Sequence, residues 1–403
     1  MAGTRTHRAA VLVERGHSPK FEVRTVPVPT VGPNDVLIRL SVTSVCGSDY
    51  GLAAGHMGPC RDILGHEGVG RIAELGKNAA TLDKSLQIGQ RVGLAWNRDV
   101  CGQCAFCMDP NNDAEARCSA KLFSGVASDG TFAEFAVAPV RYLLRLPAEL
   151  NDVSDEDIVP IMCGGVTAYK AIKECGLLPG QFIAVVGAGG VGLLALMFAK
   201  AMGYRTIGID VNAEKGVLAK EHARVDHYVD LSSLPKPVEG APAANPFWSP
   251  VGDAVKKLTP NGLGVQAVLV ASGAPAAYQS AFGMLAPFGA FMCVGISPID
   301  KPVLFHPVAF IANGWRLLGS AVGKRGDILE ALDFVKRGLV KPLTKPAKFS
   351  TIDQLVTDVG LGKVDGKYVI RLDDEEASDA KVPPPTATAV PVETAPEVTP
   401  TAA

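Results

Sequence analysis

Residues 182–192 of the chain read FIAVVGAGGVG, a short apolar strand pattern that runs directly into a glycine-rich turn. A helical pattern follows over Gly190–Met202, with apolar residues on nearly every side, and Gly203 ends it. Arg205–Asp210 then has the pattern of a second short strand. Together the three segments predict two parallel strands joined by a crossover helix.

Later strand candidates alternate with helical patterns, namely Asp226–Val229, Val265–Ser272 and Phe288–Gly295. Strands that alternate with helices favour an α/β fold built on a parallel, doubly wound sheet. After Asp300 the pattern becomes mixed, with a helix expected over Asp327–Arg337 and a last strand over Lys367–Leu372.

The first third of the chain differs from this region, because its apolar residues alternate in short segments bounded by Gly and Pro. This pattern favours an antiparallel, barrel-like domain. The segments are Arg8–Glu14, Val36–Val45, Gly68–Glu74, Arg91–Ala95 and Thr131–Pro139. A chain of 403 residues is long enough for the two domains that these two regions imply.

Two segments differ from both regions in composition. Leu234–Pro250 is rich in Pro, Ala and Ser and predicts a surface excursion, followed by a short helix over Val251–Leu258. Residues 373–403 begin with an acidic run and continue as low-complexity Pro, Thr, Ala and Val, so we expect a disordered tail there.

The overall composition narrows the class of partner. A net charge of -2 offers no basic surface for nucleic acid or anionic lipid, so a small molecule is the favoured partner. We find neither an apolar leader after Met1 nor a run of about 18 apolar residues, and expect a cytoplasmic protein. In that compartment the nine cysteines favour metal sites over disulfides.

The glycine-rich turn has the features of a dinucleotide site. Gly187, Gly189 and Gly192 permit a tight turn and a close approach of the backbone to a pyrophosphate. The N–H groups at the helix start, at Gly190 and Val191, would then face the anion.

Asp210 ends the following strand, eighteen residues after Gly192. A carboxylate there can accept hydrogen bonds from the adenosine ribose hydroxyls and would repel a 2′-phosphate, which predicts NAD rather than NADP. A helix N-cap or a turn residue is the alternative role for Asp210.

Two groups of side chains are candidates for metal sites. Cys101, Cys104 and Cys107 recur every third residue and Cys118 follows, and four thiolates can enclose a structural zinc completely.

The second group is dispersed and comprises Cys46, His66 with Glu67, and Cys163. Two thiolates and one imidazole would leave a fourth position open for water or an alkoxide, as at a catalytic zinc. Spacing alone does not assemble this group, because a lone Cys or His is more often a packing residue.

The motifs around these residues occur in a characteristic order. Cys-Gly-Ser-Asp begins at Cys46, Gly-His-Glu-Gly-Val-Gly at Gly65, and Cys-Gly-Gly-Val-Thr-Ala-Tyr-Lys-Ala at Cys163, with the cysteine lobe between the last two and the glycine turn at Gly187 after them. Over about residues 8–372 the chain thereby resembles the zinc-containing medium-chain alcohol dehydrogenases, most closely the yeast and fungal branch.

This resemblance implies a GroES-like antiparallel β-barrel catalytic domain and a Rossmann cofactor domain. It implies hydride transfer between a primary or secondary alcohol and NAD, two zinc ions per chain and, by analogy, a homotetramer. The implied division is 1–164 for the first part of the catalytic domain with its zinc lobe at 97–120, 165–303 for the cofactor domain, 304–372 for the return to the catalytic domain, and 373–403 for the tail.

The resemblance also implies roles at the catalytic centre. Cys46, His66 and Cys163 would hold the catalytic zinc, with Glu67 as a transient ligand, and the cysteine lobe would hold the structural zinc. Asp49 would accept the free N–H of His66, and Ser48 would accept the alcohol proton.

Further residues are implied around the cofactor and substrate. They are Thr167, Val270 and Val294 at the nicotinamide, Lys215 near the adenosine ribose, Lys367 facing the pyrophosphate, and Trp96 in the substrate pocket. For the two lysines a solvated surface position stays open as the alternative.

Two positions depart from the family pattern. Gly51 stands where many relatives have a histidine that relays the proton, which leaves His56, the cofactor ribose or water as candidates beyond Ser48. Gly47 stands where a basic residue often meets the pyrophosphate, so NAD is expected to leave faster.

Three other functions stay open. One is an NAD(P)H-dependent reductase of a bulkier carbonyl in a fungal specialised pathway, on the same fold. Another is a zinc module that binds nucleic acid or protein, which the near-neutral charge disfavours. The third is a zinc-free quinone-type reductase, a branch that lacks the ligands present in this chain.

Overall fold

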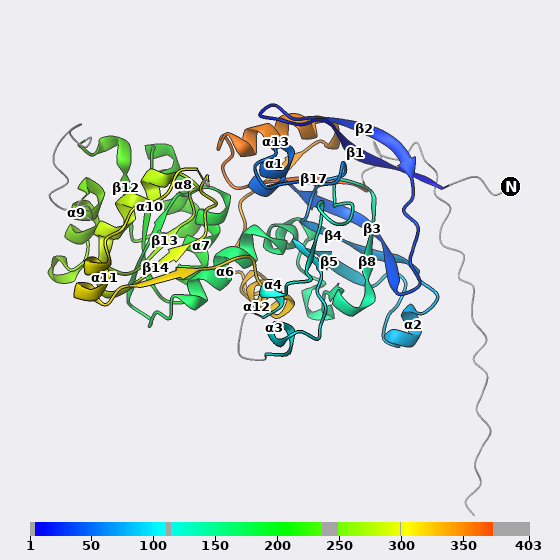
Figure 1. The fold of residues 1–403 in the computed structure, drawn as a ribbon, viewed down its shortest axis with the longest axis horizontal. Coiled ribbons are helices and arrows are strands. Elements are labelled where there is room, and N and C mark those ends of the chain that lie inside the picture. The colour runs from blue at the N-terminus through cyan, green and yellow to red at the C-terminus, as the bar shows by residue number, and fades with distance from the viewer. Residues whose placement is uncertain (1–4, 110–113, 236–248, 299, 374–403) are drawn as a thin grey trace, which may run out of the picture.

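A computed structural model describes residues 5–109, 114–235, 249–298 and 300–373 of the chain (Figure 1). Most of the expected excursion at 234–250 and nearly all of the expected tail at 373–403 lie outside these described residues. No helix in the described ranges combines the length and apolar character needed to cross a bilayer.

A six-stranded parallel sheet forms around the segment at 182–192. Its strand order is β12-β11-β10-β13-β14-β15, and every neighbouring pair is parallel. The strands are β10 (Phe182–Val186), β11 (Arg205–Asp210), β12 (His227–Asp230), β13 (Val265–Val270), β14 (Leu285–Cys293) and β15 (Arg316–Gly319). The strand order reverses direction between β10 and β13, and ligands of doubly wound sheets bind at that point, beyond the carboxyl ends of the strands.

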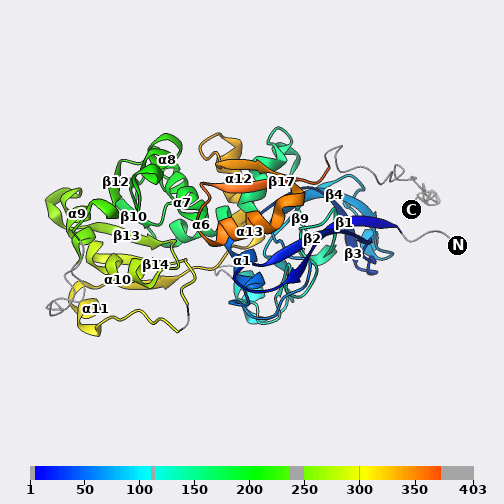
Figure 2. The same ribbon diagram turned by 90° about the horizontal axis from the view of Figure 1, so that it is seen from above.

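Helices cover both faces of this sheet (Figure 2). Alternate residues of β10 point to opposite faces, so Ile183 packs in the core with α6 (Gly164–Glu174) and α7 (Gly190–Ala201), whereas Ala184 packs in the core with α9 (Pro250–Lys257). The remaining helices of this region are α8 (Ala213–Ala223), α10 (Pro275–Ala281) and α11 (Pro307–Asn313). The predicted doubly wound α/β architecture is therefore confirmed.

A seven-stranded sheet carries the first part of the chain together with its return segment. The order is β16-β17-β3-β4-β5-β9, with β8 also paired to β3. The strands are β3 (Asp35–Ser44), β4 (Gly68–Leu75), β5 (Arg91–Leu94), β8 (Phe135–Pro139), β9 (Leu144–Arg145), β16 (Thr344–Ala347) and β17 (Lys367–Arg371). All pairs are antiparallel except β16 with β17. The pairing of β17 with β3 brings together two strands that lie near opposite ends of the sequence.

Shorter elements complete the described chain. The hairpin β1 (Thr6–Glu14) with β2 (Lys20–Pro27) and the pair β6 (Asn97–Asp99) with β7 (Leu122–Phe123) are separate two-stranded sheets. The helices are α1 (Gly47–Ala53), α2 (Ala79–Leu82), α3 (Ala105–Met108), α4 (Ala114–Arg117), α5 (Asp155–Ile158), α12 (Arg325–Lys336) and α13 (Ile352–Gly360).

Two predicted strands start three or more residues away from the expected position. The strand expected from Thr131 begins at Phe135, because the N–H groups of Thr131 and Phe132 bond instead to the carbonyls of Gly65 and Leu64. The strand expected from Phe288 begins earlier, at Leu285, and Phe288 itself has a positive φ of 61° within an irregular register. The first of these differences brings residues 131 and 132 against the loop that carries His66.

Candidate active site

Three segments far apart in the chain bring the dispersed candidate ligands together. Cys46 immediately precedes α1, His66 and Glu67 precede β4, and Cys163 precedes α6. One ligand atom from each of these four residues lies within 4.8 Å of all the others, and all four side chains are buried. The structure thus supplies the proximity that the spacing in the sequence does not establish.

Asp49 orients the imidazole of His66. Its Oδ1 lies 2.9 Å from Nδ1 of His66 and accepts the N–H of Gly65 at 3.1 Å, while Oδ2 accepts the N–H of Cys46 at 2.9 Å. Burial lowers the pKa of His66, but the opposing effect of Asp49 and Cys46 is larger. The pKa of His66 therefore lies well above its ordinary value. With Nδ1 held by the carboxylate, Nε2 is left to face the thiols of the set.

The donor set fits a zinc ion. Nε2 of His66 is fully buried and has no hydrogen-bond partner among the described residues, an arrangement that a metal bond would satisfy. A hydrogen bond from Cys163 and the charge of Lys367 hold the pKa of the Cys46 thiol well below its ordinary value, so this sulfur is available as the thiolate that zinc prefers.

Glu67 and Lys367 form a buried ion pair behind this set. Oε1 of Glu67 lies 2.7 Å from Nζ of Lys367 and also accepts the N–H of Gly164 at 3.2 Å, and the hydroxyl of Ser44 donates to Oε2. Lys367 is only 5% exposed, so the alternative of a solvated surface lysine is wrong for this residue. A Cβ added at Gly190 would lie 3.3 Å from Cδ of Lys367, which places the lysine beside the glycine turn.

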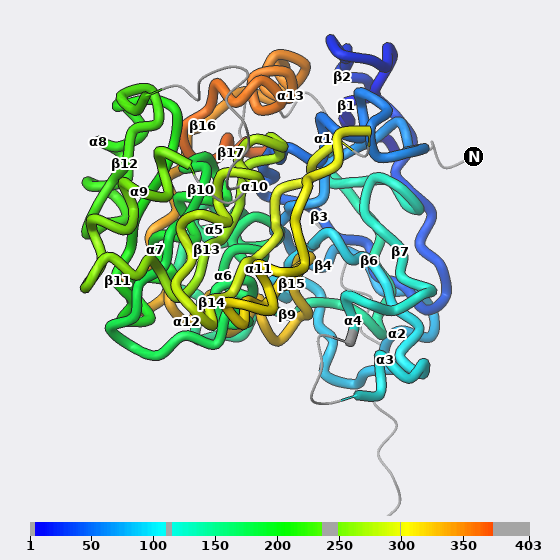
Figure 3. The backbone as a smooth tube through the Cα atoms, turned by 60° about the vertical axis from the view of Figure 1, so that its left-hand side comes forward, coloured from blue at the N-terminus to red at the C-terminus, as the bar shows by residue number. Residues whose placement is uncertain are grey.

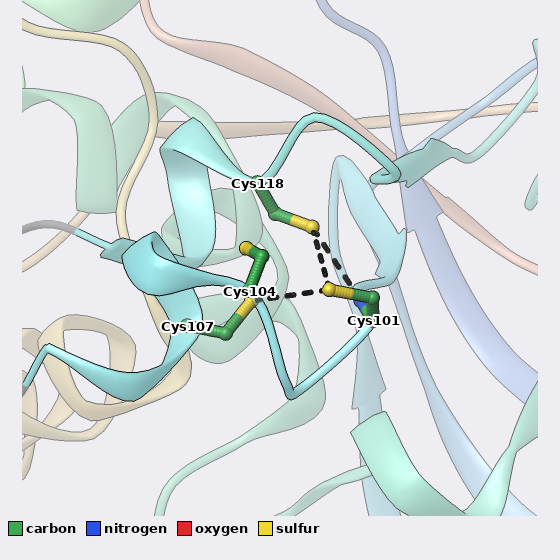
Figure 4. A group of neighbouring side chains, drawn as sticks. All are labelled: Cys101, Cys104, Cys107 and Cys118. Carbon is green, nitrogen blue, oxygen red and sulfur yellow. Dashed lines mark hydrogen bonds between the residues drawn. The ribbon is translucent and has the colours of Figure 1, made fainter.

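The four cysteines of the second group also converge (Figure 4). Their sulfurs lie within 4.8 Å of one another, with Cys118 Sγ 3.6 Å and Cys107 Sγ 4.0 Å from Cys101 Sγ. The backbone N–H groups of Gln103 and Cys104 lower the pKa of Cys101 to about 6. All nine cysteines of the chain carry free thiols, and this closed set of four fits a zinc without a substrate position.

The glycine turn lies at the carboxyl end of β10 with Asp210 beside it. Oδ2 of Asp210 accepts the N–H of Ala188 at 2.6 Å, which fixes the carboxylate at the turn. A Cβ added at Gly192 would lie 1.6 Å from the carbonyl oxygen of Gly187, so the close approach of turn and helix requires glycine there. The N-cap of α8 is Asn212, so the alternative that Asp210 caps this helix is wrong.

The other cofactor candidates lie on the elements around this turn. Val270 and Val294 are linked by the bond from the N–H of Val294 to the carbonyl of Val270, at 3.2 Å. Thr167 lies one helical turn after Cys163 in α6, and its N–H bonds to the Cys163 carbonyl at 2.9 Å. Nζ of Lys215 lies 3.9 Å from Asp365, with the lysine side chain only 13% exposed.

Trp96 and α1 border the catalytic set. The Trp96 ring meets the His66 ring edge to face, with 4.8 Å between centroids. Ser48 lies in α1, two residues after Cys46, and is half-buried. A Cβ added at Gly51 would lie 2.8 Å from the sulfur of Met57, so Met57 occupies the space that a larger residue 51 would need.

Sequence reasoning did not identify Met57 or Ser44 as neighbours of the site. The only signal for Met57 was the unusual glycine at position 51. His56 is exposed, and its ring contacts Tyr50 and His17 at centroid distances of 6.1 and 5.4 Å.

Comparisons with known proteins agree with this geometry. A family model described as the alcohol dehydrogenase GroES-like domain matches residues 32–148, and one described as zinc-binding dehydrogenase matches residues 190–337. An alcohol dehydrogenase of Geobacillus stearothermophilus is 32% identical over 359 residues, which span 88% of this chain and 96% of the relative. The chain belongs to the zinc-containing medium-chain alcohol dehydrogenase family.

Other members of the family support the same assignment. Alcohol dehydrogenase 2 of Emericella nidulans is 32% identical over 374 residues, covering 90% of this chain and 97% of the relative. The solved alcohol dehydrogenase of the archaeon Aeropyrum pernix aligns with a TM-score of 0.75 at 27% identity, covering 90% of this chain and 99% of that one.

Membership confirms the expected GroES-like barrel combined with a Rossmann-like parallel sheet. It also makes the protein an oxidoreductase, which is at odds with the alternative of a zinc module for nucleic acid or protein in which the rest of the chain is only a scaffold.

Proposed function

We propose that this oxidoreductase is a zinc-dependent alcohol dehydrogenase that transfers hydride reversibly between a primary or secondary alcohol and NAD, giving an aldehyde or ketone. The observation that carries the proposal is the buried, unpartnered Nε2 of His66 beside the thiols of Cys46 and Cys163. A zinc ion bound by these three residues supplies a Lewis acid that lowers the pKa of an alcohol in the open position.

The chain's own residues have separate proposed roles around this position. Asp49 holds the His66 tautomer, and Ser48 accepts the alcohol proton. Because Met57 fills the space beside Gly51, the proton continues to water or the cofactor ribose rather than to a side chain at position 51. Glu67, whose charge Lys367 balances, is the carboxylate that would take the place of water as a transient ligand of a bound zinc.

NAD is the proposed cofactor because the carboxylate of Asp210 lies at the glycine turn, where it would accept bonds from ribose hydroxyls and repel a 2′-phosphate. The turn residues Gly187, Gly189, Gly190, Val191 and Gly192 are the proposed pyrophosphate site. Thr167, Val270, Val294, Lys215 and Lys367 complete the proposed cofactor contacts.

Small alcohols are the proposed substrates because the bulky Trp96 ring lies directly against His66 and narrows the space over the open position. Steady-state rates for ethanol and for a series of larger alcohols and carbonyls test this choice. Ethanol turnover within an order of magnitude of the best substrate supports it, and negligible ethanol turnover would favour the reductase of a bulkier carbonyl.

Other features of the proposal concern the whole molecule. The barrel takes strands from both ends of the chain, in keeping with our division into 1–164, 165–303 and 304–372. The last boundary needs one change, because α11 and β15 belong with the six-stranded cofactor sheet, so we propose that the return to the barrel begins after β15. Free thiols at both candidate metal sites suit a cytoplasmic setting.

We also propose a homo-oligomer, a tetramer by analogy, in which a second copy pairs along the open edge of β15. Four large apolar side chains around this edge are more than half exposed, namely Leu304, Phe305, Val308 and Ile311. An edge strand beside exposed apolar residues is a template for association.

Metal analysis of the purified protein is the primary test. We expect about two zinc ions per chain, one for each ligand set. A single zinc per chain that is lost on mutation of Cys101, with no NAD-linked alcohol oxidation, would refute the catalytic assignment.

A further inference from the structure

The turn after β15 contains a strained residue. Val322 has a φ of 38°, in the left-handed region that β-branched residues very rarely adopt. Such a conformation persists only where surrounding contacts hold it. The contacts at both ends of this turn therefore matter for its shape.

The strained turn borders both elements of the proposed nicotinamide site. The N–H of Ser320 donates to the carbonyl of Cys293 at 3.1 Å, which fixes the turn to the end of β14, one residue before Val294. On its other side, a Cβ added at Gly323 would lie 2.3 Å from a methyl carbon of Val166, next to Thr167 in α6.

The cysteine lobe holds the N-terminal end of this turn. A guanidinium N–H of Arg117, the residue before Cys118, donates to the carbonyl of Gly319 at 3.0 Å, across 202 residues of sequence. Gly319 is the last residue of β15, three positions before Val322. Figure 3 shows α4 of the lobe near β15.

The same helix holds the C-terminal end of the turn. Oε1 of Glu115 accepts a guanidinium N–H of Arg325 at 3.0 Å, and Oε2 accepts the Arg325 backbone N–H at 3.3 Å. The hydroxyl of Tyr142 lies 3.0 Å from Oε2 of Glu115, and the Arg325 guanidinium stacks 4.3 Å from the centre of the Tyr142 ring. Arg325 lies three positions after Val322.

We propose that Glu115 and Arg117 are positioning residues that clamp both ends of the Val322 turn and thereby set the shape of the cofactor site. This inference rests on the proposed function for the identity of that site. Cys118 follows directly in the chain and belongs to the closed set of four thiols, so the lobe's own metal set anchors α4. The lobe then supports cofactor binding as well as local stability.

The test compares E115Q with D83N in the full-length protein. The Asp83–Arg145 pair is a matched control, because its 2.9 Å contact and its 28% and 45% exposed side chains resemble the Glu115–Arg325 pair, with 21% and 34%. We expect E115Q to speed hydrogen exchange of the 319–325 amides about tenfold and to raise the NADH dissociation constant by a similar factor. D83N should change neither, and both variants should keep their zinc content.

A second variant addresses the strain itself. Asn tolerates the left-handed region, so V322N combined with E115Q should return the exchange of the 319–325 amides towards the wild-type rate. Equal exchange in E115Q and D83N, or no recovery with V322N, would overturn the clamp. Faster exchange with unchanged NADH affinity would overturn its link to the cofactor site. A wild-type protein that binds no NADH would refute the proposed function, while the exchange comparison would still decide whether Glu115 holds the turn.

Discussion

Nζ of Lys367 lies 2.7 Å from Oε1 of Glu67, although 300 residues separate the two in the chain and neither side chain reaches the surface. Strand β17 carries the lysine beside β3, and β4, which also pairs with β3, follows Glu67 directly. Burial raises the pKa of Glu67 above its ordinary value, and the ammonium of Lys367 offsets only part of this effect. The last strand of the fold therefore places a cation that favours the charged form of this carboxylate next to the candidate metal ligands.

Replacing Lys367 by Met should lower the free energy of unfolding by about 3–5 kcal/mol, because Glu67 would be left as an unpaired buried charge. Urea unfolding monitored by circular dichroism measures this loss. The double variant K367M/E67Q should recover most of it, because no charge is then left uncompensated. A double variant as unstable as K367M would show that packing of the lysine stem, rather than its charge, accounts for the effect.

Replacing Cys163 by Ala should abolish alcohol oxidation while leaving NADH affinity within about twofold, because the thiolate belongs to the open ligand set and not to the glycine turn. Metal analysis should show one zinc per chain fewer than in the wild type. As a control, Cys175 to Ala should retain both zinc ions, because that buried thiol lies outside both ligand sets. Residual turnover in C163A would contradict the assignment.

Replacing Asp210 by Gly should raise the ratio of NADP to NAD efficiency by at least about tenfold, because a like-charge contact with a 2′-phosphate costs several kcal/mol. The measurement is kcat/KM for each cofactor. Asp230 provides a matched control, because it ends the adjacent strand β12 and pairs in register with Asp210. An unchanged ratio in D210G, or an equal change in D230N, would show that Asp210 does not recognise the ribose.

Asp226 should make a pH-dependent contribution to stability. Burial raises the pKa of Asp226, but the opposing effect of Lys200 at 2.8 Å and of the N–H of Thr206 at 2.8 Å is larger. The pKa of Asp226 therefore lies below its ordinary value. Since the folded pKa is lower than the unfolded one, the stabilisation is complete above the unfolded pKa of about 3.9 and is lost as the pH falls through the folded value.

The D226N variant should accordingly be less stable than the wild type by about 1 kcal/mol at pH 7, with the difference shrinking below about pH 4. Urea titrations at pH 7, 5 and 3.5 measure it. A difference that stays constant at acid pH would mean that the charge of Asp226 is irrelevant.

Replacing Leu317 on β15 by Glu should weaken association of copies, because an acidic side chain on the open strand edge opposes pairing with its equivalent. Light scattering across a concentration series gives the mass of the assembly. The control is the same substitution at Leu82 on α2. The exposed fraction of Leu82 is 57%, which is close to the 48% of Leu317. An unchanged mass in L317E would place the interface elsewhere.

Local patterns predicted the cofactor half of the fold well. Phe182–Val186 and Arg205–Asp210 have the bounds expected from the sequence, because buried parallel strands are short apolar runs and the glycine turn marks where the first one ends. The cysteine lobe was also predictable, since its four thiols lie within eighteen residues of chain. Hairpin strand β2 was not identified, because most of its residues are exposed and its apolar signal is weak.

The catalytic set could not be derived from residue patterns alone. Cys46 and Cys163 become neighbours through sheet topology and helix packing that no local periodicity encodes, and only the resemblance of the surrounding motifs connected them. The partner of Lys367 was likewise not foreseen, because the pairing of β17 with β3 depends on nonlocal contacts. Val322 gave no signal, since its strain exists only in the folded chain.

The position of β17 has a consequence for how the protein is made. A ribosome releases Cys46, His66 and Cys163 long before it reaches Lys367, so a growing polypeptide displays the ligands without the ammonium that balances Glu67. The barrel is likewise open until residues 367–371 dock on β3. If zinc fills both ligand sets as proposed, loading of the buried set would therefore follow translation of β17, whereas the cysteine cluster, encoded within one short stretch, would be complete much earlier.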